Sequence, residues 1–130
     1  DFGQLPANIS VYSRVDQIAV LSKADVFFSH CRMNSVSESL YFGVPIAMLP
    51  QTSEQLGVAR RTAELGAGIL LENTEAQTIR HAAEKLMAEP SYKKNAEMIS
   101  EGFHRCGGAS AAADKILQVC GKGEKIQEKK

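Results

Sequence analysis

Short apolar runs alternate with helical patterns along most of this chain. Four runs have the length and the apolar character of β-strands, at 9–12, 25–30, 45–49 and 68–71. Apolar residues recur at helical spacing between them, over 15–23, 34–42 and 53–65. Strands that alternate with helices are typical of βαβ units. We therefore predict an α/β fold: a Rossmann-like parallel sheet of about four short strands, flanked by helices.

Only helical patterns follow the last predicted strand. Thr74 to Gln77 has the sequence of a capping box, which predicts a helix start. A second helix starts at Pro90 and is broken by Gly107 and Gly108. A third is predicted over 110–120. We expect its apolar side to be buried through Ala113, Ile116, Leu117 and Cys120.

The last ten residues differ in composition from the rest of the chain. Lys and Glu are frequent from 121 to 130, which favours a solvated, disordered tail. We therefore expect one domain over 1–120 and a charged tail over 121–130. The 130 residues are enough for one small domain.

Composition and charge exclude several classes of function. Hydrophobic residues make up 44% of the chain, which is enough to bury a core. The charged fraction of 23% is close to the ordinary globular value, which excludes disorder for most of the chain. Fifteen basic and fifteen acidic residues give no net charge, so no field favours nucleic acid or an anionic membrane surface. No run reaches the roughly 18 apolar residues of a membrane span. Three scattered cysteines are typical of free thiols in a reducing cytoplasm, and none has metal-ligand spacing with a histidine.

Two strand-to-helix turns hold the candidate chemistry. In an open parallel sheet, ligands bind beyond the carboxyl ends of the strands. The first turn carries His30 at a strand end, then Asn34 and Ser35 at a helix start, then Glu38 one turn further on. A helix start offers free N–H groups to an anion, and a carboxylate can accept hydrogen bonds from a vicinal diol.

The second turn carries Glu54 and Gln55, whose acceptors and donors suit sugar hydroxyls. Each turn also has a purely structural interpretation. Ser35 to Glu38 has the spacing of a capping box, and a single histidine at a strand end is more often structural. In the second turn, Ser53 can be the N-cap of a solvated helix.

The residues of both turns, taken together, resemble a known signature. The chain reads His30-Cys31-Arg32-Met33-Asn34-Ser35-Val36-Ser37-Glu38, then Gly43-Val44-Pro45, then Pro50 to Gln55. It is similar to the donor-binding signature of the UDP-glycosyltransferases, the inverting enzymes of glycosyltransferase family 1 with the two-domain GT-B fold. Further segments, Glu64 to Gly68 and Gly107 to Ala109, most resemble the bacterial macrolide glycosyltransferases. The resemblance covers roughly 14–117.

The resemblance implies a role for each matching residue. His30 would contact the diphosphate of a nucleotide sugar, and Asn34 and Ser35 would bind its phosphate oxygens. Glu38 would accept hydrogen bonds from the ribose. Glu54 and Gln55 would hold the transferred sugar. Gln17 would contact the nucleoside, since it matches the Gln of the family's W-x-P-Q motif.

The implied reaction is transfer of a hexose from a nucleotide sugar to a hydroxyl of a small-molecule acceptor, with inversion. The donor would be similar to UDP-glucose, and no metal or other cofactor is implied.

Three positions depart from the family pattern. Arg14 stands at the family's base-stacking Trp, and Asp16 at its Pro. A guanidinium plane can also stack on a base, so Arg14 is a candidate nucleoside contact. Arg32 stands at a Gly that lets the phosphates approach the backbone. It either crowds that approach or adds a charged phosphate clamp.

Only the donor-binding part of the family is matched. In the family, the acceptor site and the general-base His belong to an N-terminal domain, which nothing here resembles, and the first strands of the donor domain have no match. We expect a part of a longer enzyme that is inactive in transfer by itself. The strand at 25–30 would expose an edge through which a dimer could form.

Three other interpretations stay open. The first is a non-catalytic nucleotide-sugar-binding module or subunit, completed by a partner chain. The second is a degenerate relative in which Arg32 abolishes donor binding. The third is a redox role for Cys31, since a helix start can lower the pKa of a thiol.

Overall fold

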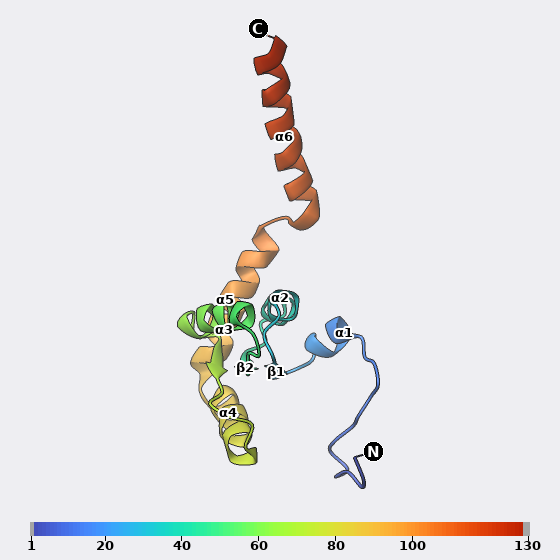
Figure 1. The fold of residues 1–130 in the computed structure, drawn as a ribbon, viewed down its shortest axis with the longest axis vertical. Helices are drawn as coiled ribbons and strands as arrows, with labels where there is room; N and C mark the ends of the chain where they lie inside the picture. Colours follow the sequence, from blue (N-terminus) through green and yellow to red (C-terminus); the bar gives the residue numbers. More distant parts are fainter. Residues whose placement is uncertain (1, 129–130) are drawn as a thin grey trace.

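The structure is a computed structural model that describes residues 2–128, with side chains described as far as Gly121. Strands and helices alternate up to residue 70, and only helices follow (Figure 1). The elements are α1 (Gln17–Leu21), β1 (Phe27–Ser29), α2 (Met33–Tyr41), β2 (Ile46–Met48), α3 (Ser53–Glu64), β3 (Gly68–Leu70), α4 (Ala76–Ala88), α5 (Pro90–Arg105) and α6 (Gly108–Glu128).

Three parallel strands form one sheet in the order β1-β2-β3. In register, Phe27 lies opposite Ile46, and Ile46 lies opposite Gly68. The helices α2 and α3 make the two crossovers that parallel strands require. The predicted α/β fold with a parallel sheet flanked by helices is therefore confirmed, with three strands in place of four.

The central strand β2 divides the core in two. Its three residues are fully buried, and alternate side chains face opposite sides of the sheet. Ile46 and Met48 belong to the larger cluster, which includes residues of α2, α3 and α5. Ala47 faces the smaller cluster, which Ala82 and Leu86 of α4 complete. The sheet is thus covered by helices on both faces, as a parallel sheet requires.

Gly68 allows a close backbone approach within the sheet. A Cβ at this position would lie 2.5 Å from the carbonyl oxygen of Ile46 and 3.0 Å from Cε of Met48. A backbone carbonyl in a strand ladder cannot move aside, so only glycine fits where β3 begins.

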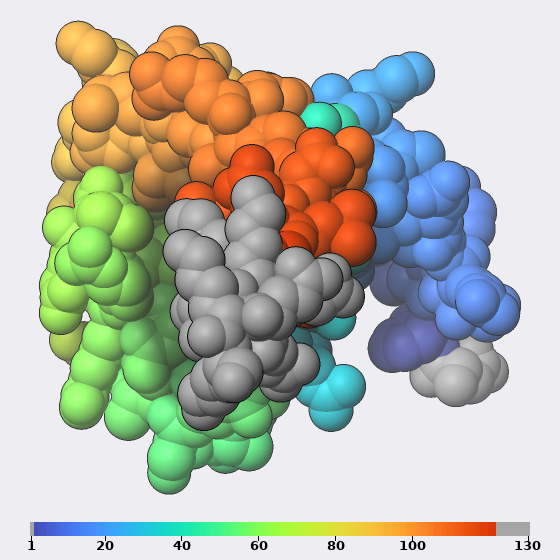
Figure 2. Space-filling model, turned by 90° about the horizontal axis from the view of Figure 1, so that it is seen from above, coloured from blue at the N-terminus to red at the C-terminus, as the bar shows by residue number. Residues whose placement is uncertain are grey.

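The strand predicted at 9–12 is wrong. These residues belong to an irregular N-terminal segment, and Ile9, Val11 and Tyr12 are exposed. In Figure 2 this segment, in blue, lies at one side of the molecule, away from α3 in green. The alternation of apolar and polar residues is a local signal, whereas a strand needs a neighbour for its backbone hydrogen bonds. No described residue provides that neighbour.

The burial predicted for the last helix is also wrong. Helix α6 projects away from the layers around the sheet (Figure 1), and Ile116 and Leu117 are more than 60% exposed. Ala113 and Cys120 are exposed as well. The helix leaves the layers at the turn between α5 and α6, where Gly107 and Gly108 both have positive φ and end α5. The boundary expected at 120 lies inside α6. Residues 129–130 and the side chains from 122 lie outside the described residues, so the charged tail stays a prediction.

The start of α4 differs from the predicted capping box. Its N-cap is Glu75, and no side chain caps the helix. The Oδ1 atom of Asn73 accepts a hydrogen bond from the backbone N–H of Glu75 at 2.9 Å. The polar turn before the helix is therefore stabilised by Asn73 and not by Thr74.

The strand β1 lies at the edge of the sheet, since β2 is its only partner among the described residues. The exposed edge expected for this strand is thus confirmed. Within the described part of the chain, no helix is both long enough and apolar enough to cross a membrane.

Candidate functional site

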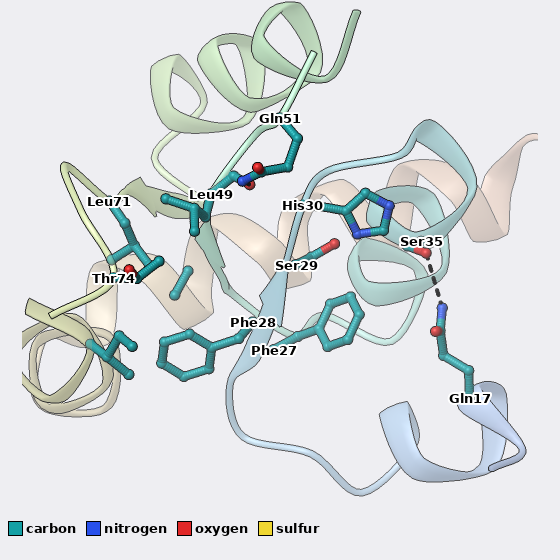
Figure 3. Close-up of a pocket in the computed structure, with 12 residues that line it drawn as sticks. Gln17, Phe27, Phe28, Ser29, His30, Ser35, Leu49, Gln51, Leu71 and Thr74 are labelled. Carbon is teal, nitrogen blue, oxygen red and sulfur yellow. Dashed lines mark hydrogen bonds between the residues drawn. The ribbon is translucent and has the colours of Figure 1, made fainter. Parts of the chain in front are cut away.

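The carboxyl ends of the three strands meet at one cavity of about 640 Å³. His30 follows β1, Leu49 and Gln51 follow β2, and Leu71 and Thr74 follow β3. Figure 3 shows these residues around the cavity, with Gln17 and Ser35 at one end and Leu71 and Thr74 at the other. A cavity therefore lies at the predicted position of the site, beyond the strand ends.

A second cavity of about 560 Å³ lies between the starts of α2 and α3. Arg32, Asn34 and Ser35 line it from α2, and Glu54 and Gln55 line it from α3. Ser35 lines both cavities, so they meet at the first turn of α2. A ligand that extends from one cavity to the other must pass the start of this helix.

The start of α2 presents free backbone donors at that junction. Its N-cap residue is Arg32, and no side chain caps the helix. The first helical hydrogen bond runs from the N–H of Val36 to the carbonyl of Arg32 at 3.1 Å. Among the described residues, the N–H groups of Met33, Asn34 and Ser35 have no acceptor. The capping box considered for Ser35 and Glu38 is therefore wrong, and the helix start remains available to an anion.

Gln17 connects α1 to this helix start. Its Nε2 atom donates to Oε2 of Glu38 at 2.7 Å and lies 3.3 Å from Oγ of Ser35. Asp16, where the family has Pro, is the N-cap of α1, and its Oδ1 accepts from the N–H of Ala19 at 3.2 Å. Gln17 of α1 and Ser35 and Glu38 of α2 thus form one polar group. Asp16, which departs from the family pattern, has a structural role as the cap of α1.

Gln55 is fixed at the wall of the second cavity. It is 7% exposed, and its Oε1 accepts a hydrogen bond from the N–H of Gln51 at 2.7 Å. Thr52 caps α3, since its Oγ1 accepts from the N–H of Gln55 at 3.3 Å. The predicted N-cap, Ser53, is therefore one residue late. The amide nitrogen of Gln55 keeps its donors for a ligand.

The structure brings most of the candidate residues together. Glu38 lines neither cavity and is joined to them through Gln17. Arg14 is exposed and lines neither cavity. The remaining seven candidates line one or both: Gln17, His30, Arg32, Asn34, Ser35, Glu54 and Gln55.

Gln51 and the apolar wall of the first cavity were not among the predicted site residues. Gln51 lines that cavity and also holds Gln55 through its backbone N–H. Its position directly after the strand-ending Pro50 was the signal. Phe28 and Ile79 are apolar lining residues, and nothing in their local sequence separates them from core residues.

Cys31 is a buried structural residue. It has a φ of 70°, in the left-handed region, and its N–H donates to Oγ of Ser29 at 3.0 Å. Burial raises the pKa of its thiol from the ordinary 9.0 to about 11, against a smaller lowering by the backbone of Leu49. The hypothesis of a redox-active Cys31 with a lowered pKa is therefore wrong.

We expect a thiol reagent at pH 8 to modify two cysteines quickly. Cys106 and Cys120 are exposed, whereas Cys31 is buried and remains protonated. Colorimetric thiol counting should reach two per chain in buffer and three in denaturant. Because the folded pKa is raised, the neutral thiol stabilises the fold fully below pH 9, and this contribution is lost as the pH rises towards 11. Three fast thiols in buffer would contradict this account.

No group of three or more His, Cys, Asp or Glu side chains with metal-site geometry occurs among the described residues. The polar side chains that line the two cavities are amides, hydroxyls, the imidazole of His30, the guanidinium of Arg32 and one carboxylate, that of Glu54. Binding of a donor without a metal stays a prediction.

The fold is shared with solved GT-B glycosyltransferases. CalG4, the calicheamicin glycosyltransferase, has a TM-score of 0.86 at 29% identity, over 92% of this chain and 31% of that one. The glycotransferase of kitacinnamycin has a TM-score of 0.83 at 32% identity, over 91% and 31%.

The chain belongs to the family described as Erythromycin biosynthesis protein CIII-like, C-terminal domain, whose model matches residues 1–106. The resemblance to glycosyltransferase family 1 is thereby confirmed. An NDP-glycosyltransferase, YjiC, of Bacillus licheniformis is 39% identical over 88% of this chain. The oleandomycin glycosyltransferase of Streptomyces antibioticus is 30% identical over 89%. The chain spans 30% and 27% of the length of these two relatives.

Proposed function

We propose that this chain binds the nucleotide-sugar donor of a glycosyltransferase. The observation that carries the proposal is the uncapped start of α2, with free N–H groups where the two cavities meet. A diphosphate has the charge and the acceptors to satisfy these groups. On this proposal the nucleoside side of the donor lies near Gln17 and Glu38, and the sugar lies near Glu54 and Gln55.

The side chains around the helix start supplement the backbone. His30 lines the first cavity beside Ser35, where it can donate to a phosphate oxygen. Asn34 lines the second cavity and adds an amide donor. Glu38 has one oxygen bonded to Gln17, which leaves Oε1 for a ribose hydroxyl. Arg14 is proposed as a nucleoside contact on the family position alone.

The proposed reaction is transfer of a hexose to a hydroxyl acceptor, with inversion. The backbone N–H groups at the start of α2 would stabilise the negative charge that develops on the leaving diphosphate, so the transfer of the sugar needs no metal ion. The general base and the small-molecule acceptor site would belong to an N-terminal domain. The chain by itself would bind the donor without transferring the sugar.

For the nucleobase and the sugar of the donor we propose candidates and not a single identity. UDP-glucose is the reference donor. A thymidine nucleotide is a second candidate carrier, since VinC, a glycosyltransferase solved in complex with dTDP, matches this fold with a TM-score of 0.73 at 29% identity. We also propose a cytoplasmic location, which the free thiols of Cys31, Cys106 and Cys120 support.

A second candidate function is a binding module that a partner chain completes. Among the described residues, β1 has no partner on its outer edge, and its free backbone groups there favour pairing with a further strand. A second copy of this chain could provide it in a dimer. Sedimentation at increasing concentration distinguishes a monomer from such a dimer.

A thermal unfolding series tests donor binding. A ligand that binds only the folded chain stabilises it by RT ln(1 + [L]/Kd), so the midpoint should rise with ligand concentration. We expect UDP, dTDP and UDP-glucose to raise the midpoint, and uridine to raise it much less at the same concentration. Equal midpoints with and without these nucleotides, up to millimolar concentration, would contradict the proposal.

A further inference from the structure

We propose that Arg32 selects a donor whose sugar carries a carboxylate, a hexuronate, over one with a neutral hexose. This inference rests on the proposed donor site and names the class of sugar that fits it. It concerns the second cavity, where Arg32 lies with Glu54 and Gln55.

Arg32 has no partner of its own among the described residues. It is the N-cap residue of α2, yet its side chain makes no capping hydrogen bond. The ion pairs of the described residues join Arg61 to Glu64, Arg80 to Glu84 and Lys93 to Glu97. Arg32 and Glu54 therefore share a cavity without neutralising each other. The cavity therefore presents one guanidinium and one carboxylate that are not paired with each other.

The diphosphate has sufficient partners without Arg32. The free N–H groups of α2 and the side chains of His30 and Ser35 lie where the two cavities meet. Arg32 lines the second cavity together with Glu54 and Gln55, the residues proposed to hold the sugar. A group of the sugar in this cavity is therefore a candidate partner for the guanidinium.

The other walls of the cavity suit ring hydroxyls. Glu54 offers carboxylate acceptors in the first turn of α3, and the buried Gln55 offers amide donors. A hexuronate keeps the ring hydroxyls of glucose and adds one carboxylate. A guanidinium binds a carboxylate through two parallel N–H···O bonds, whereas a neutral sugar would remove water from the cation without matching its charge.

Calorimetric titration with UDP, UDP-glucose and UDP-glucuronate tests this selection. For the unmodified chain we expect UDP-glucuronate to bind about ten-fold more tightly than UDP-glucose. In Arg32→Gly, which restores the family residue, the two donors should bind equally. Arg32→Lys should keep a smaller preference, since lysine has the charge without the planar pair of donors. Arg61→Ala, which changes an exposed cation on α3, is the control and should keep the full preference.

Three results would overturn the inference. The first is equal binding of the two donors by the unmodified chain. The second is a preference that persists in Arg32→Gly. The third is an equal loss of UDP itself in Arg32→Gly and Arg32→Lys, which would make Arg32 a phosphate clamp. Failure of the donor site as a whole has a different signature, because a folded chain would then bind none of the three nucleotides.

Discussion

Replacing Glu38 by alanine is expected to weaken UDP binding about 100-fold. The proposed ribose contact is a hydrogen bond to Oε1 of the carboxylate, and losing a hydrogen bond to a charged group costs about 1.5–3 kcal/mol, of which the upper end corresponds to the expected 100-fold. The substitution also removes the partner of Gln17, whose Nε2 donates to Oε2 of Glu38 at 2.7 Å. Calorimetric titration with UDP measures the change directly.

Two further variants separate the ribose contact from a general loss of structure. Glu38→Gln keeps an acceptor without the charge, so its affinity for UDP should lie between those of the unmodified chain and of Glu38→Ala. Glu64→Ala removes a carboxylate from an exposed pair with Arg61 on α3 and should leave binding unchanged. A Glu38→Ala chain that is folded by circular dichroism and binds UDP normally would contradict the assignment of Glu38.

Replacing Ile46 by alanine is expected to destabilise the fold by about 2–5 kcal/mol. Ile46 is fully buried in the central strand, between Phe27 of β1 and Gly68 of β3. Its truncation would leave a cavity in the larger core cluster, which joins the sheet to the helices on that face. The free energy of unfolding, from urea titration, is the measurement.

The matched control for this substitution is Ile46→Val, which removes one methylene and should cost about 0.5–1.5 kcal/mol. A second comparison is Ile18→Ala, since Ile18 lies on α1 and is 53% exposed. It should change stability by no more than about 0.5 kcal/mol. If Ile46→Ala cost no more than Ile18→Ala, the described core would be wrong.

Local sequence patterns correctly predict those elements whose apolar residues also find a partner surface in the tertiary structure. The crossover units of the sheet have apolar runs bounded by turn residues, and their strands find neighbours in the chain itself. The run at 9–12 and the helix over 110–120 have similar patterns but find no surface to cover. A local pattern shows which residues can be buried, and it cannot show whether a partner surface is present.

The candidate site follows the same rule. Strand ends and helix starts are visible in the sequence, which is why His30, Ser35 and Gln55 could be placed at one edge of the sheet. Contacts between distant residues are not visible in this way. The hydrogen bonds of Gln17 to Ser35 and Glu38 depend on where α1 lies. The start of α2 is uncapped because the side chain of Arg32, its N-cap residue, makes no capping hydrogen bond.

The central claim is that the start of α2 binds a diphosphate beside His30. The most direct test is calorimetric titration of UDP and of uridine into the unmodified chain and into His30→Ala, with the exposed His81→Ala as control. The account predicts saturable binding of UDP at one site, much weaker binding of uridine, and at least a ten-fold loss of UDP affinity in His30→Ala alone. Equal UDP affinity in all three chains, or no binding by a folded unmodified chain, would contradict it.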